Sequence, residues 1–167
     1  METYHKAIII FLFAIVTGPA LSADPLGQAF SAVARGQQEL IKGQSAQAEK
    51  AFTDALDLFP GWYRPMLGMA VVQLQMGRPV TKAIKWINKA LSLEPNRWDT
   101  QLTAGRVMEA AGRPEQAMQH YLRAAYLSAA HRDVIRDYAC SLAARIPKTK
   151  KTPGFQNLRC NKPQPQN

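Results

Sequence analysis

Apolar side chains recur at helical spacing along most of this chain, and three glycines divide the pattern into similar stretches. The glycines, Gly43, Gly77 and Gly112, are spaced 34 and 35 residues apart. An alanine follows each glycine after five or six positions, and a large apolar or aromatic residue comes four positions later. These large residues are Phe52, Ile87 and Tyr121. A small residue also lies seven positions before each glycine, at Gly36, Ala70 and Gly105. The pattern predicts a repeated pair of helices rather than one long helix.

The physical interpretation of each unit is a helix, a glycine turn and a second helix. Glycine adopts the left-handed conformation that ends many helices, and the second helices open at Ser45, Pro79 and Pro114. Small residues let paired helices approach closely, while the large residues fill the space between successive units. One helix pair cannot bury both of its faces, so the units stack around a shared elongated core. We therefore expect an all-α solenoid.

The two ends of the repeat region carry their own helix signals. Asp24 and Pro25 are typical of a helix start. Residues 131–146 form a further apolar-periodic stretch, which Pro147 ends, and we expect it to be a capping helix. Its predicted inward side consists of Val134, Ile135, Tyr138, Leu142 and Ile146.

This combination of spacing, turn glycines and small residues resembles the tetratricopeptide repeat family, with units at about 29–61, 62–95 and 96–130. Pro60 and Pro95 close the first two units as the family pattern requires, whereas Ala129 replaces the proline of the third. The resemblance implies a right-handed α-solenoid of three helix pairs plus the capping helix. It also implies a concave groove, lined by the first helix of each pair, that holds a peptide or helix of another protein.

Transferring the family's groove positions gives a candidate partner-binding site. Its residues are Phe30, Val33, Gln37, Arg64, Leu67, Val71, Leu74, Leu102, Arg106 and Glu109, and the transferred groove positions also include Leu40, Ile41, Gln75, Asp99 and Ala110. The expected surface is an apolar floor flanked by Arg64 and Arg106, suited to an apolar or amphipathic segment that carries an acidic residue. The alternative is that Leu67, Val71 and Leu74 are ordinary core residues or are covered by the N-terminal helix.

Residues 1–23 have the layout of a secretory signal peptide. Lys6 precedes the apolar run Ala7–Val16, and Pro19 and small residues follow it. Cleavage after Ser22 and cleavage after Ala23 both satisfy the requirement for small residues. A retained membrane anchor is the alternative, although the run is short for a bilayer. We expect a periplasmic or secreted protein.

Export affects the interpretation of the two cysteines. Cys140 and Cys160 are the only pair in the sequence, so an oxidising compartment favours one disulfide between them. Two free thiols remain the alternative. Neither cysteine belongs to a metal-binding or redox motif.

The net charge of +9 is concentrated near the C-terminus. Six basic residues and no acidic residue lie between Arg145 and Asn167, and residues 147–167 are expected to be a mostly disordered, basic tail. The tail could contact an anionic membrane surface, although simple solvation is the more economical interpretation.

The sequence offers little support for catalysis. His120 and His131 lack carboxylate or thiol neighbours at metal-ligand spacing and are expected to be solvated or helix-end residues. Asp133 and Asp137 are expected to pair with Arg132 and Arg136. We therefore expect no enzyme activity, no catalytic residue, no metal and no cofactor. The repeats carry no ladder of aromatic and basic residues, so nucleic acid is not an expected partner.

These observations predict a non-catalytic adaptor in the cell envelope that binds a segment of another envelope protein, with assistance to a pilus, secretion or other envelope complex as one possible setting. A surface-tethering protein whose basic tail binds anionic lipid or polysaccharide is the alternative function. Self-association through the repeats is a third possibility, so the oligomeric state is left open.

Overall fold

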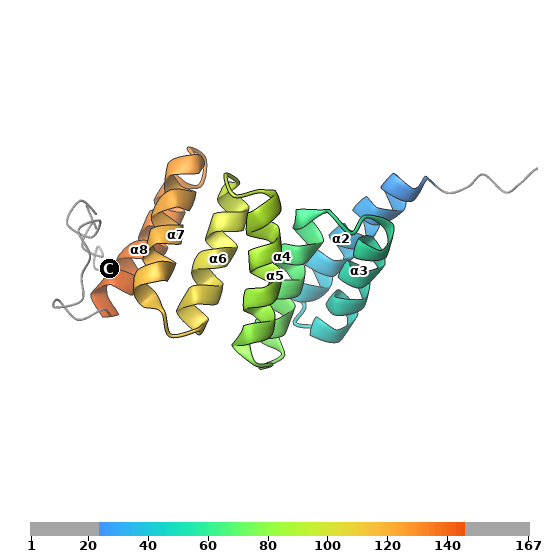
Figure 1. Ribbon diagram of the computed structural model, residues 1–167, viewed down its shortest axis with the longest axis horizontal. Helices are drawn as coiled ribbons and strands as arrows, with labels where there is room; N and C mark the ends of the chain where they lie inside the picture. Colours follow the sequence, from blue (N-terminus) through green and yellow to red (C-terminus); the bar gives the residue numbers. More distant parts are fainter. Residues whose placement is uncertain (1–23, 146–167) are drawn as a thin grey trace, which may run out of the picture.

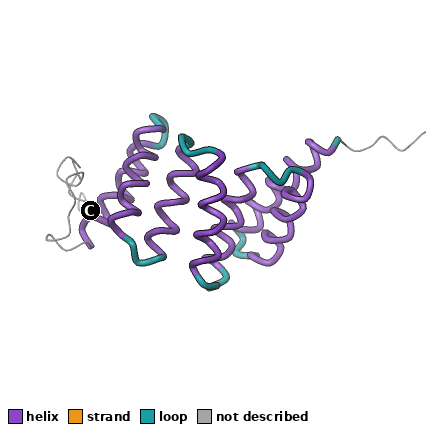
Figure 2. Tube along the Cα trace, viewed as in Figure 1, coloured by secondary structure: helices purple, strands orange, loops and turns teal. Residues whose placement is uncertain are grey.

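The computed structural model describes residues 24–145, and every regular element in that part of the chain is an α-helix. The helices are α2 (Pro25–Ile41), α3 (Ser45–Leu58), α4 (Tyr63–Gln75), α5 (Val80–Leu93), α6 (Trp98–Ala110), α7 (Pro114–Leu127) and α8 (Arg132–Arg145). They follow one another in chain order along an elongated array, with α2 and α8 at opposite ends (Figures 1 and 2). The expected fold class, an all-α solenoid of three helix pairs with a capping helix, is confirmed.

Each helix packs most extensively against its neighbours in sequence, and the first helices of the pairs also contact one another. Thus α2 contacts α4, and α4 contacts α6, so these three helices form a continuous row. The second helices, α3, α5 and α7, each pack against the first helix of their own pair and against the helix that follows them. The α2/α4/α6 row therefore presents one shared surface built from three repeats.

The same turn closes the first helix of all three pairs. Gly43, Gly77 and Gly112 have φ values of 75°, 62° and 67°. After α2, Gly43 N donates to Leu40 O at 3.1 Å and Gln44 N donates to Glu39 O at 2.8 Å. The corresponding bonds recur after α4 and α6. This pair of bonds is the Schellman motif, which satisfies helix-end carbonyls and favours glycine at the left-handed position.

Large side chains of the second helices fill the gaps left by glycines, as the sequence predicts. Phe52 is almost fully buried, and its ring lies so close to Gly36 and Gly68 that a Cβ on these glycines would be 2.6 Å and 2.4 Å away from ring atoms. Tyr121 lies equally close to Gly105. The helices can therefore pack tightly only because these glycines have no side chain.

A polar cluster joins the first two repeats. The guanidinium of Arg78 forms two bonds with the carboxylate of Glu49, at 2.5 Å and 2.9 Å. The buried Gln73 donates to Glu49 at 3.3 Å and accepts from Arg78 at 3.1 Å. The hydrogen bond from Arg78 is the main reason that the pKa of Glu49 is lowered from its usual value, and burial opposes it. The cluster thus ties α3 and α4 to the turn that leads into α5.

Replacement of Gln73 by leucine is expected to lower the free energy of unfolding by about 1 kcal/mol, because two hydrogen bonds of a buried amide are lost while its volume is roughly kept. Chemical denaturation followed by circular dichroism measures this difference. Gln116→Leu is the control, because Gln116 is exposed on α7 and should change stability little. Equal effects of the two substitutions would contradict a stabilising role for the cluster.

The expectation for the capping helix is only partly correct. Ile135 and Leu142 are buried as expected, but Val134 and Tyr138 are exposed, and Ala139 and Ala143 complete the buried side. The physical reason is that the side facing α7 is set by small residues, which allow a closer approach than Tyr138 would. Asp133 pairs with Arg136 at 3.1 Å, as predicted.

Several predictions lie outside the described residues. They concern the signal peptide at residues 1–23, Ile146, the basic tail at residues 147–167 and Cys160. Cys140 lies half-buried on α8, and its predicted disulfide with Cys160 stays a prediction.

Candidate functional site

The α2/α4/α6 row contains a hollow of about 370 Å³, here called the central hollow. Its lining residues are Gln37, Leu40, Phe52, Arg64, Leu67, Gly68, Val71, Trp98, Asp99 and Thr103. All except Phe52 come from the first helices, and Phe52 reaches the hollow because Gly68 leaves its ring uncovered from that side. The apolar lining side chains are buried or partly buried, whereas the polar side chains of Gln37 and Arg64 are exposed. The hollow can therefore accept an apolar side chain while contacting polar groups beside it.

Hydrogen bonds and an ion pair hold the charged side chains of the central hollow in place. Tyr63 donates its hydroxyl to Asp99 at 3.2 Å and accepts a bond from Arg64 Nε at 3.3 Å. The carboxylate of Asp99 also accepts a bond from Thr100 N at 3.0 Å and lies 3.5 Å from Arg97 Nε. Asp99 is thus committed to neighbours within the chain. Arg64 is exposed, and no ion pair joins it to an acidic side chain within residues 24–145.

The structure brings four of the predicted groove residues together in the central hollow, namely Gln37, Arg64, Leu67 and Val71. Leu40 and Asp99, which are also among the transferred groove positions, line it as well. Leu67 is largely buried, so its contribution to a binding surface is limited to one edge of the side chain. Some of the predicted groove residues that line the hollow are therefore also part of the hydrophobic core.

The remaining predicted residues lie elsewhere. Val33 is buried in the core of the first repeat, and Leu74 and Leu102 are partly buried against the main core. Arg106 is exposed on α6 but does not line the central hollow. The expected apolar floor is thus flanked by Arg64 and Asp99 rather than by two arginines.

Glu109 serves as a link between helices. Its carboxylate accepts a bond of 2.8 Å from the hydroxyl of Tyr121 on α7 and is also paired with Arg145 on α8. Burial, followed by the bond to Glu109, raises the pKa of Tyr121 above its usual range. Glu109 therefore fastens α6 to α7 and α8.

Trp98 lines the hollow although the transferred family positions did not assign it to the groove. The sequence did contain a signal for this role of Trp98. The residue directly precedes Asp99, a transferred groove position, at the start of α6. The ring of Trp98 stacks on His131, with centroids 4.2 Å apart and an interplanar angle of 16°. The start of α8 thus supports one wall of the hollow.

A second, more apolar depression lies beside the start of α4 and is here called the aromatic rim. It is lined by Leu26, Phe30, Phe59, Pro60, Gly61 and Trp62. Phe30 contacts Trp62 edge to face, with ring centroids 4.8 Å apart. The structure therefore places Phe30 in the aromatic rim and not in the central hollow.

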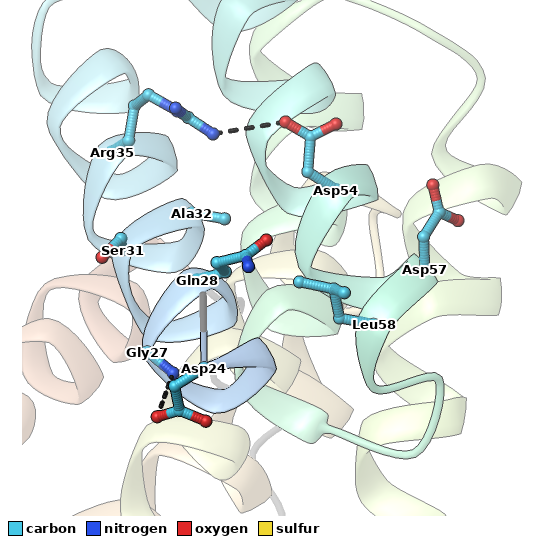
Figure 3. Close-up of a pocket in the computed structure, with 9 residues that line it drawn as sticks. All are labelled: Asp24, Gly27, Gln28, Ser31, Ala32, Arg35, Asp54, Asp57 and Leu58. Atoms are coloured by element: carbon cyan, nitrogen blue, oxygen red, sulfur yellow. Dashed lines mark hydrogen bonds and ion pairs between the residues drawn. The ribbon is translucent and has the colours of Figure 1, made fainter. Parts of the chain in front are cut away.

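A third hollow, the largest of the three at about 750 Å³, lies between α2 and α3 at the N-terminal end of the array (Figure 3). Three of its charged side chains are engaged within the chain, and Figure 3 shows Arg35 reaching across to Asp54, a contact of 3.2 Å. Asp24 is the N-cap of α2, accepting bonds from Leu26 N and Gly27 N at 3.1 Å each. These contacts identify Asp24, Arg35 and Asp54 as helix-capping and helix-pairing groups.

The two described histidines both have structural partners. His131 Nδ1 lies 2.9 Å from Ser128 Oγ at the start of α8. His120 Nδ1 lies 2.7 Å from Gln101 Oε1, and Gln101 in turn donates to Pro95 O at 2.6 Å. Because the Gln101 amide nitrogen is the donor to Pro95, His120 Nδ1 supplies the hydrogen in its own bond. His120 is therefore a half-buried bonded residue and not a solvated one.

His120 is expected to make stability depend on pH. Burial, followed by the charge of Arg123, lowers its pKa below the ordinary 6.5. The unfolded chain thus takes up a proton before the folded chain does, and the free energy of unfolding falls as pH decreases through about 6.5. The slope for one group cannot exceed about 1.4 kcal/mol per pH unit. Denaturation of wild type and His120→Asn at pH 7 and pH 5.5 tests this: the variant should show the smaller decrease, and an identical decrease would contradict the assignment.

Within residues 24–145 no three histidine, cysteine or acidic side chains are grouped so that they could hold a metal ion. Among the described helices, none combines the length and the apolar content that a membrane crossing requires.

Comparison with solved structures identifies a protein of similar fold. The chain resembles PcrH, as seen in the crystal structure of PcrH in complex with the chaperone binding region of PopD. The TM-score is 0.60 at 20% sequence identity, and the match covers 75% of this chain and 96% of PcrH. No protein-family model matches the chain, and no curated protein matches it. The likeness supports an all-helical repeat fold.

Proposed function

We propose that this chain is an exported, non-catalytic adaptor of the tetratricopeptide repeat type, which binds a segment of another cell-envelope protein in the central hollow. The observation that carries the proposal is the hollow itself, which combines an apolar floor with an exposed arginine on a row of helices from three repeats. PcrH, which shares the fold, was crystallised with a region of another protein. Partner binding by this chain is our extension of that likeness.

The physical basis of recognition would be burial of an apolar side chain together with a charged contact. Val71 and the edge of Leu67 provide apolar area, which stabilises a complex by about 25 cal/mol for each Å² removed from water. Arg64 can add a bidentate bond to a carboxylate, which gives orientation as well as energy. The side chains that form this surface belong to helices and are therefore largely preorganised, which reduces the entropy lost on binding.

Affinity purification from the envelope fraction of the native organism tests this function. The tagged wild-type chain is compared with Arg64→Glu, and Arg113→Glu provides the same charge change at an exposed position outside the hollow. We expect a defined protein to be recovered with wild type and with Arg113→Glu, and recovery with Arg64→Glu to fall about tenfold. Equal recovery with all three chains would contradict binding in the hollow. If loss instead followed deletion of residues 147–167, the tail would be the binding element.

Periplasmic or secreted location is part of the same proposal and rests on the signal-peptide layout of residues 1–23. Sequencing the N-terminus of the protein recovered from the envelope fraction tests it. A mature chain beginning at Ala23 or Asp24 supports export with cleavage, whereas a chain that keeps Met1 and stays with the cytoplasm would contradict it. Mass measurement of the same sample with and without reducing agent tests the disulfide between Cys140 and Cys160.

A further inference from the structure

The aromatic rim leaves large apolar side chains in contact with water. Leu26 and Phe30 are 51% and 52% exposed, and they lie one turn apart on the same face of α2. Trp62 and Phe59 extend this surface across the loop between α3 and α4. Clustered apolar surface of this kind is typical of a binding site, because its exposure costs free energy that a partner can recover.

The aromatic rim and the central hollow each have a lining residue near the start of α4. Trp62 lines the rim, and Arg64, two residues further on, lines the hollow. Phe30 and Arg64 also occupy equivalent positions on the first helices of successive repeats. One short segment can therefore contact both depressions if it passes over Arg64.

The charge at this junction favours an acidic group in the segment. Among the described residues 24–145, Arg64 gives only its Nε to a bond, at 3.3 Å to the hydroxyl of Tyr63, so its two terminal nitrogen atoms can donate outward. Asp99, the nearest acidic residue of the hollow, is already bonded to Tyr63 and Thr100 and paired with Arg97. The positive charge of Arg64 is thus not neutralised by a direct ion pair within the described chain, and a carboxylate complements it.

We infer that the partner segment carries an acidic residue between two large apolar residues, with one apolar side chain in the central hollow, the carboxylate on Arg64 and the second apolar side chain on the aromatic rim. This inference rests on the proposed function and adds to it a second anchoring site and an order of side chains.

Selection from a displayed library of short random peptides tests the inference and does not require the partner to be identified first. The bait is the protein purified after expression of the full 167-residue sequence. We expect enriched peptides to contain Asp or Glu with a large apolar residue on both sides. A synthetic copy of an enriched peptide then serves as the probe in fluorescence anisotropy.

Substitutions assign each contact of that peptide. Leu26→Ser and Phe30→Ser should each raise the Kd about fivefold, and Tyr126→Ser is the control because Tyr126 is 82% exposed on α7, away from both depressions. Arg64→Glu should raise the Kd about tenfold, and exchange of the acidic peptide residue for lysine should restore binding to this variant. Circular dichroism and thermal melting confirm that each variant is folded. If Phe30→Ser loses its fold because the contact with Trp62 is removed, Leu26→Ser decides the result.

The outcomes separate the inference from the function on which it rests. If Val71→Lys in the hollow weakens binding but Leu26→Ser and Phe30→Ser do not, the second anchor is wrong and the proposed function stands. Enriched peptides without an acidic residue, or without a second apolar residue, would also overturn the inference. If wild type enriches no peptide relative to Val71→Lys, both the inference and the proposed function are wrong.

Discussion

Replacement of Phe52 by alanine is expected to lower the free energy of unfolding by about 3–5 kcal/mol. The ring is almost fully buried, and it fills the space between Gly36 on α2 and Gly68 on α4. Neither glycine has a side chain that could move into the space left by the ring. The helices themselves would have to move in order to close the cavity, so a large part of the lost packing energy cannot be recovered.

Urea denaturation followed by circular dichroism measures this effect, with Tyr126→Ala as the control. Tyr126 also loses an aromatic ring, but its side chain lies mostly in water, so its removal should change stability little. A decrease below about 1 kcal/mol for Phe52→Ala would contradict the role assigned to the ring at the junction of the first two repeats. The lining of the central hollow should be disturbed as well, because Phe52 forms part of it.

Replacement of Gly105 by alanine is expected to destabilise the protein by about 2 kcal/mol, although alanine is the better helix former. A Cβ at position 105 would lie 2.4 Å from two atoms of the Tyr121 ring. That ring is buried and its hydroxyl is bonded to Glu109 at 2.8 Å, so it cannot easily move aside. The steric overlap therefore outweighs the gain of about 1 kcal/mol in helix propensity.

Gly27→Ala is the matched control, because the same exchange occurs in a helix without a close neighbour. A Cβ at position 27 would have its nearest contact at 3.4 Å, with Asp24 Oδ2. This variant should be neutral or slightly more stable than wild type. If both glycine variants changed the unfolding free energy in the same direction, close packing of Tyr121 would not be the reason that Gly105 is required.

The sequence was most informative where a physical requirement repeats. The turn glycines predict left-handed helix ends, and the small residues Gly36 and Gly105 predict a close approach of paired helices, because each requirement recurs at a fixed spacing. Gly68 could not be identified in this way. It also contacts Phe52, but the positions equivalent to it in the other repeats, Ala34 and Thr103, are not glycine.

The candidate site was harder to predict than the fold because family positions do not specify local neighbours. Phe30 and Arg64 occupy equivalent positions in successive repeats. The ring of Phe30 nevertheless packs against Trp62 in a separate depression. Glu109 was assigned to the groove, but its bond to Tyr121 depends on the placement of α7, and its pairing with Arg145 depends on the placement of α8. The placement of α8 follows from the burial of Ala139 and Ala143. The apolar pattern in the sequence instead put Val134 and Tyr138 on the buried side, and both are exposed.

Site-specific photo-crosslinking in cells tests the binding role of the α2/α4/α6 row most directly. A photoreactive amino acid is placed at Gln37, which is exposed and lines the central hollow, or at Gln116, which is exposed on α7. We expect position 37 to give a defined cross-linked species with a second protein, and position 116 to give none. No species at position 37, or the same species from both positions, would contradict partner binding in the central hollow.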